Sequence, residues 1–214
     1  MDKTLKYFED KYNLDLTQKS PIEIEGVGRL DLVRWLRELR FKKGVEVGVN
    51  LGEYSKLICD NNTQMKLYGV DPYLKYDTYH EYESQKQMDE IYEEAKLKLK
   101  SYVDDGQYEF IRKTSMDALE DFEDESLDFV YIDANHELDF PFKDIEGWAK
   151  KIRPGGIIAG HDYVRIRVLN FTIKDALEKY TKENNINPWF VLGTYVVRPG
   201  IVRDRTRSWC FVKQ

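Results

Sequence analysis

Hydrophobic and polar positions along this chain follow helical and strand periods in turn. Apolar residues at helical spacing predict helices over residues 29–40, from Ser84 to about Tyr102, and from Phe171 to Lys182. Short β-branched or continuous apolar runs predict strands between and after them. The expected strands cover residues 45–49, 67–70, 108–111, 127–132, 157–159, 189–192 and 208–212.

Three further helices complete the pattern. Two short ones are expected over residues 53–60 and 115–120. The third begins near Pro141, carries Ile152 on its apolar side, and ends at Gly155-Gly156. Helices and strands therefore alternate through five strands, and a final strand pair follows.

This order predicts an α/β fold: a doubly wound, mostly parallel sheet with helices on both faces. At 214 residues the chain suits a single domain, residues 1–214. Residues 1–28 form an N-terminal extension, either a short helix and strap laid over the fold or a partly ordered arm.

Candidate functional residues follow the expected strands. Ligands of open α/β sheets bind outside the carboxyl ends of the strands. The polar residues at such ends are Glu46 to Gly52, Asp71, Ser115, Asp133 to His136, and His161-Asp162. Their gathering at one edge of the sheet predicts a binding site there.

The segment 44–56 reads as strand, glycine turn and helix, the first half of a nucleotide-binding unit. Asp71 lies about 20 residues beyond, where such folds hold a ribose. A pyrophosphate site needs three close glycines, but Asn50 holds the middle position and Glu46 adds a negative charge. A ligand with an ammonium or sulfonium group and a ribose fits better, and S-adenosylmethionine has all of these.

Composition narrows the class of protein. With 42% hydrophobic and 34% charged residues the chain reads as soluble and globular. Its net charge of −6 argues against nucleic-acid binding, and no apolar run approaches a membrane span. Cys59 and Cys210 have no metal-ligand spacing, which together with the absence of a signal peptide favours a reducing compartment, the cytoplasm.

The pattern Glu46-x-Gly48-x-x-x-Gly52 with Val70-Asp71 resembles the class I S-adenosylmethionine-dependent methyltransferases. The segments 128–136 and 153–163 narrow the resemblance to small-molecule O-methyltransferases, including those that act on macrolide sugars. It implies a seven-stranded sheet with an antiparallel last strand, and a sugar or other small-molecule hydroxyl as acceptor. It also implies cofactor contacts from Glu46, Gly48, Asn50, Gly52, Asp71, Ser115, Met116 and Asp133.

Many members of this group also bind a divalent cation. The corresponding positions here are Asp133, His161 and Asp162, and His161 departs from the group's acidic pair. Two interpretations stay open: a metal that grips the acceptor hydroxyl, or His161 as general base with Asp162 orienting it. Catalytic candidates are therefore His161, Asp162, Asp133 and His136.

Other functions remain open at this stage. One is an NAD-dependent oxidoreductase, and another is a non-catalytic S-adenosylmethionine-binding protein. Four arginines between residues 198 and 207 suit an anionic acceptor, although a solvated charge cluster explains them as well. The oligomeric state is open too, a homo-oligomer included.

Overall fold

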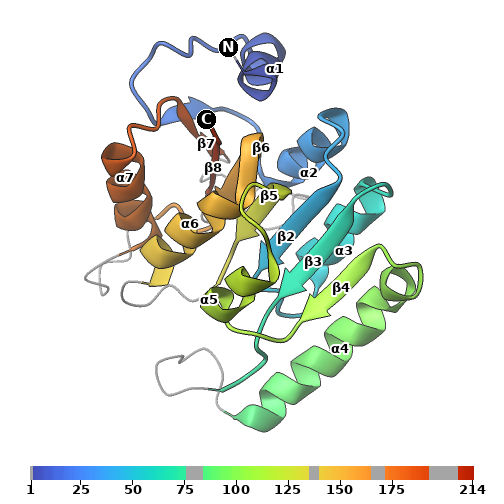
Figure 1. The fold of residues 1–214 in the computed structure, drawn as a ribbon. Coiled ribbons are helices and arrows are strands. Elements are labelled where there is room, and N and C mark those ends of the chain that lie inside the picture. The colour runs from blue at the N-terminus through green and yellow to red at the C-terminus, as the bar shows by residue number, and fades with distance from the viewer. Residues whose placement is uncertain (1, 76–83, 135–139, 165–171, 193–206) are drawn as a thin grey trace.

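The fold is built around one eight-stranded sheet (Figure 1). The structure is a computed structural model, and it describes residues 2–75, 84–134, 140–164, 172–192 and 207–214. The strands are β1 (Ile22–Ile24), β2 (Lys43–Val47), β3 (Lys66–Val70), β4 (Tyr108–Ile111), β5 (Leu127–Ile132), β6 (Ile152–Gly160), β7 (Trp189–Leu192) and β8 (Ser208–Val212). Their order across the sheet is β1-β7-β8-β6-β5-β2-β3-β4. Among these described strands, only β8 runs antiparallel to its neighbours, β6 and β7.

Helices cover both faces of this sheet (Figure 1). They are α1 (Lys3–Tyr12), α2 (Arg29–Glu38), α3 (Glu53–Asn61), α4 (Gln85–Asp104), α5 (Ser115–Ala118), α6 (Phe140–Lys151) and α7 (Ile173–Glu183), with a 3₁₀ turn at Leu119–Asp121. Buried residues of α1 to α4 share one apolar cluster, and those of α5 to α7 share the other. The predicted doubly wound α/β fold with an antiparallel last strand is confirmed.

Strand alternation decides which side chains enter each cluster. On β2, Val45 and Val47 pack with the helices α5 to α7. Glu46 lies between them and therefore points to the opposite face, the one that α3 covers. A carboxyl group thus enters a layer that is otherwise mostly apolar.

The predicted strand count was wrong by one. β1 adds an eighth strand, which pairs in parallel with β7 and places Ile22 opposite Phe190. Only three residues long, β1 is too short for a period-two pattern to be recognised in sequence. It is held by tertiary contacts, since both of its isoleucines are buried.

The end of α6 was also predicted too late. Ile152 begins β6 and pairs with Leu127, so it belongs to the sheet rather than to the helix. Gly155-Gly156 then lie inside the strand, near a shift of register with β5. A side chain at Gly156 would come within 2.6 Å of the carbonyl oxygen of Asp128, so this glycine permits close contact between β6 and β5.

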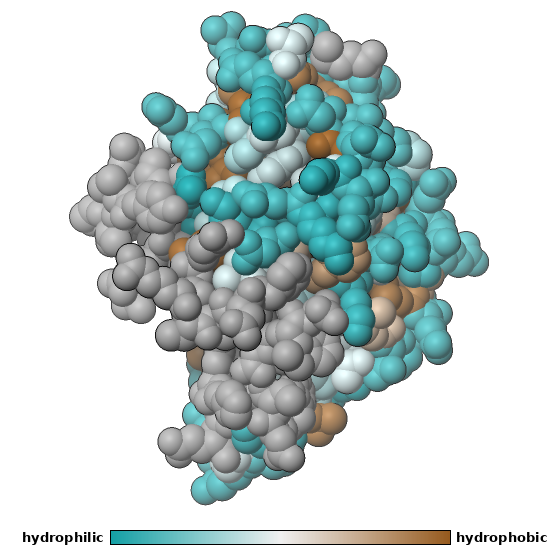
Figure 2. Space-filling view, turned by 90° about the vertical axis from the view of Figure 1, so that its left-hand side faces the viewer, coloured by the Kyte–Doolittle hydropathy of each residue, from teal (hydrophilic) through white to brown (hydrophobic). Residues whose placement is uncertain are grey.

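Within the described ranges no helix combines the length and apolarity that crossing a bilayer requires. Figure 2 shows the side that carries α7, where the coloured surface is mainly hydrophilic and hydrophobic atoms form scattered areas. Both cysteines are buried as free thiols, and burial raises the pKa of Cys59 to about 12.

Candidate functional site

The glycine loop between β2 and α3, residues 48–52, forms the centre of the predicted site. Gly48 has φ +91°, and a Cβ there would lie 2.0 Å from the carbonyl oxygen of Asp133. Gly52 has φ +73° and is the N-cap residue directly before α3. Asn50 is also left-handed, with φ +51°, a conformation that asparagine tolerates better than most residues. The loop therefore passes directly against the end of β5.

Asp71, at the end of β3, fastens this loop. Its Oδ2 accepts hydrogen bonds from the backbone N–H groups of Val49 and Asn50, both at 3.0 Å. Its Oδ1 accepts from the N–H of Tyr73 at 2.9 Å. Burial raises the pKa of the Asp71 carboxyl, against the lowering effect of these hydrogen bonds. A carboxylate offers about four acceptor positions, so a ribose hydroxyl would find one remaining.

Glu46 lies beneath the loop in a buried polar network. Its side chain accepts a short hydrogen bond from Ser55 Oγ, which is 3.0 Å from the hydroxyl of Tyr108. The Tyr108 hydroxyl fits because Gly69 has no side chain, since a Cβ there would lie 1.7 Å from it. Burial raises the pKa of Glu46 to about 8.

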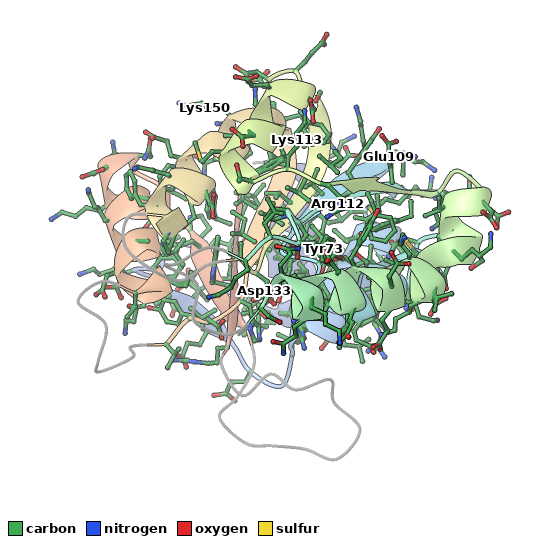
Figure 3. All side chains as sticks on the ribbon, turned by 90° about the horizontal axis from the view of Figure 1, so that it is seen from below. Tyr73, Glu109, Arg112, Lys113, Asp133 and Lys150 are labelled. Carbon is green, nitrogen blue, oxygen red and sulfur yellow. The ribbon has the colours of Figure 1, made fainter. Side chains whose placement is uncertain are left out.

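Three candidate catalytic residues meet at the carboxyl ends of β5 and β6, the edge that Figure 3 views and where it labels Asp133. His161 Nδ1 is 3.1 Å from Asp162 Oδ1 and 3.9 Å from Asp133 Oδ1. One ligand atom from each residue lies within 4.8 Å of the other two. We call Asp133, His161 and Asp162 the strand-end cluster.

Backbone hydrogen bonds hold this cluster beside the glycine loop. The N–H of Asp133 donates to Val47 O at 2.8 Å, and the N–H of His161 donates to Ile132 O at 3.1 Å. Asp162 has φ +56°, a strained conformation that often marks a functional site. Adjacent parallel strands thus bring residues 28 positions apart into contact.

Arg29, the first residue of α2, adds a cation that sequence reasoning did not identify. Its Nη1 lies 3.8 Å from Asp133 Oδ2, and its guanidinium lies over the ring of Tyr54, 5.4 Å from the centroid. Its side chain is 15% exposed. Arg29 therefore offsets part of the negative charge of the cluster, at the carboxylate oxygen of Asp133 other than the one nearest His161.

The remaining predicted cofactor contacts lie after β4. Ser115 begins α5, and its neighbour Met116 is 40% exposed. The hydroxyl of Ser115 is engaged by two residues of α6, Asp144 and Trp148.

Two groups of sequence predictions fall outside the described residues. The first is His136, and the second comprises Arg198, Arg203 and Arg205. Arg207 is described, and its Nη1 pairs with Glu23 of β1 at 2.5 Å. Arg207 therefore forms an ion pair within the protein.

Comparison with known proteins identifies the family. A family model described as a methyltransferase domain matches residues 45–163, more than half of the chain. This chain belongs to the methyltransferase-domain family. The matched segment contains the glycine loop, Asp71 and the whole strand-end cluster.

Solved structures share the fold of this methyltransferase-family chain. The O-methyltransferase TomG from Streptomyces achromogenes, involved in tomaymycin synthesis and crystallised with S-adenosylmethionine (SAM), has a TM-score of 0.61 at 16% identity, over 100% of this chain and 91% of TomG. An O-methyltransferase from Bacillus cereus in complex with SAH has a TM-score of 0.59 at 18% identity, over 100% and 92%.

A curated relative adds a local match. An uncharacterized protein from Sinorhizobium fredii is 32% identical over 74 residues, which are 35% of this chain. The match spans only 8% of the length of that relative.

Proposed function

We propose that this chain is an S-adenosylmethionine-dependent O-methyltransferase acting on a hydroxyl of a small molecule, with a sugar or glycan as the acceptor class. One observation carries the proposal: the strand-end cluster lies directly against the glycine loop, with Gly48 packed on the backbone of Asp133. A proton acceptor and a donor-binding loop in contact suit an in-line transfer, which requires both reactants to be aligned.

The donor's site in this proposal is the loop with its supports. The polar residues around it suit the donor's ammonium, sulfonium and ribose, and Glu46, Asn50, Asp71, Ser115, Met116 and Asp133 are the proposed contacts together with Gly48 and Gly52. Family membership supports methyl transfer as the reaction and counts against the oxidoreductase alternative. In methyl transfer the acceptor oxygen forms a bond to the methyl carbon, the sulfonium bond breaks, and the hydroxyl proton moves to a base.

His161 is the proposed base. With its Nδ1–H directed to Asp162 Oδ1 at 3.1 Å, the imidazole carries its lone pair on Nε2, the nitrogen that would take the acceptor's proton. Asp133 and Asp162 then stabilise the imidazolium that forms.

The same residues fit a divalent cation. Two carboxylate oxygens and one imidazole nitrogen within 4.8 Å suit manganese, iron or zinc better than magnesium. A bound cation would lower the pKa of the acceptor hydroxyl. In that case Nδ1 of His161 is the ligand and the proton lies on Nε2, the opposite tautomer from the one the base requires.

This difference in tautomer provides the test. We expect nitrogen NMR of histidine-labelled protein to show the Nδ1–H form of His161 in chelator, and methyl transfer to a panel of sugars and nucleotide sugars to persist there. His161→Gln should abolish transfer while leaving binding of S-adenosylhomocysteine unchanged. Loss of transfer in chelator, restored by one cation together with the Nε2–H form, would instead establish the metal. No methyl transfer to any hydroxyl acceptor under either condition would contradict the proposed function.

A further inference from the structure

A buried carboxylate controls the hydroxyl of the first residue of α5. Ser115 Oγ donates to Asp144 Oδ1 at 2.5 Å, and it accepts from Trp148 Nε1 at 2.9 Å. Asp144 is 3% exposed and Trp148 is fully buried, both on α6. We call these three residues the α5–α6 triad.

The triad fixes the hydrogen-bonding polarity of Ser115. A serine hydroxyl has one proton and two lone pairs. The proton is committed to Asp144 and one lone pair to the indole N–H, which can only donate. What Ser115 still offers is one lone pair, so it can accept a hydrogen bond from a ligand but cannot donate one.

The location of the triad makes this polarity relevant to a ligand. Ser115 follows β4 at the carboxyl edge of the sheet, and β4 is next to β3, whose end carries Asp71. The N–H of Asp71 donates to Ile111 O at 3.2 Å, so the two strand ends are directly joined. Beside Ser115 the side chain of Met116 is 40% exposed, an apolar surface suited to the face of a base.

We propose that Asp144, acting through Ser115, selects a donor molecule whose base carries an amino group rather than a carbonyl at its 6-position. Adenine presents a hydrogen-bond donor there, whereas hypoxanthine and guanine present an acceptor. A Ser115 hydroxyl that can only accept pairs with the 6-amino group of adenine. Against a 6-carbonyl oxygen it would place one lone pair opposite another, and no hydrogen bond would form. This inference rests on the proposed function, because it takes the ligand beside Ser115 to be the base of S-adenosylmethionine.

The burial of Asp144 supports a role in specificity. A carboxylate removed from water is costly unless it is paired and hydrogen-bonded. An asparagine could also join α5 to α6 through Ser115. An asparagine, however, has an amide that can rotate and donate to Ser115, which would release the serine proton toward the ligand. Only an acceptor such as the carboxylate holds Ser115 in one polarity.

The test compares two ligands that differ at the 6-position, S-adenosylhomocysteine and S-inosylhomocysteine, by calorimetric titration. The wild-type protein is expected to bind the amino ligand about tenfold or more tightly than the oxo ligand. In Asp144→Asn this ratio should fall toward one. The matched control is Asp124→Asn, since the Asp124 carboxylate is exposed and pairs with Lys151, and it should keep the wild-type ratio.

The outcomes separate this inference from the proposed function. Tight binding of S-adenosylhomocysteine with a wild-type ratio near one, or a ratio unchanged in Asp144→Asn, would overturn the inference and leave the proposed function standing. Failure of the wild-type protein to bind S-adenosylhomocysteine at all would overturn both. If Asp144→Asn does not fold, Ser115→Ala replaces it, and a ratio that stays at the wild-type value there overturns the role of the triad.

Discussion

At the scale of single residues, the carboxyl of Glu46 lies in a setting that carboxyl groups rarely occupy. It is 2% exposed, and burial raises its pKa from 4.5 to about 8. The folded protein therefore holds the Glu46 proton more strongly than the unfolded chain does. This contribution to stability is fully present below pH 4.5 and is lost as pH rises through about 8.

We predict that Glu46→Gln flattens the pH dependence of the free energy of unfolding between pH 5 and pH 8. The wild-type protein should lose up to about 1.4 kcal/mol per pH unit relative to the variant over this range. Urea unfolding at each pH measures the difference. Glu109→Gln is the control, since the Glu109 side chain is 55% exposed and pairs with Lys66. Parallel curves for the wild type and Glu46→Gln would show that Glu46 is ionised in the fold.

At the scale of elements, the turn from β2 into α3 depends on glycine for two separate reasons. Gly48 has a left-handed φ and also lies where a Cβ would meet the carbonyl of Asp133. Gly106, after α4, has φ +75°, and no atom lies within 4 Å of the point that a Cβ would occupy there. The two positions thus share the conformational requirement and differ in the space available.

Gly106→Ala should cost about 1–2 kcal/mol of stability, the penalty for a left-handed alanine. Gly48→Ala should cost more than that, because the loop or the end of β5 must move, and it should also weaken binding of S-adenosylhomocysteine. Urea unfolding and calorimetry measure the two effects. Equal stability losses in the two variants, with ligand binding intact, would mean that the close approach at Gly48 is unimportant.

At the scale of the whole molecule, the N-terminal residues are packed into the core. Phe8 is fully buried, with its ring centroid 4.7 Å from that of Trp35 and 5.2 Å from that of Phe190. Thr4 Oγ1 donates to Gly155 O at 2.7 Å, which ties α1 to β6. The packed helix of the two sequence alternatives is the one observed.

We predict that Phe8→Ala destabilises the whole protein by about 3–5 kcal/mol. For a chain of this size that corresponds to a melting temperature lower by about 6–20 °C. Lys6→Ala on the exposed side of α1 should change it little, because its ion pairs with Glu9 and Asp10 are on the surface. Thermal unfolding of the two variants measures this difference. Equal melting temperatures would show that α1 is a dispensable arm.

From residue 29 onward, the sequence by itself determined the order of the elements and the edge of the sheet where polar residues gather. The long parallel strands were predictable because they are buried on both faces and read as continuous apolar runs, as at 127–132. Asp133, His161 and Asp162 were predictable as neighbours because consecutive parallel strands end at one edge.

Only the tertiary structure decided how those polar groups are used. Asp71 holds the loop through three backbone N–H groups, Arg29 faces Asp133, and Asp144 takes the proton of Ser115. Each contact joins residues more than 20 positions apart or depends on loop backbone geometry, which no local pattern encodes. The three-residue strand β1 and the early start of β6 belong to the same class, because strand pairing across the sheet, rather than local propensity, stabilises them.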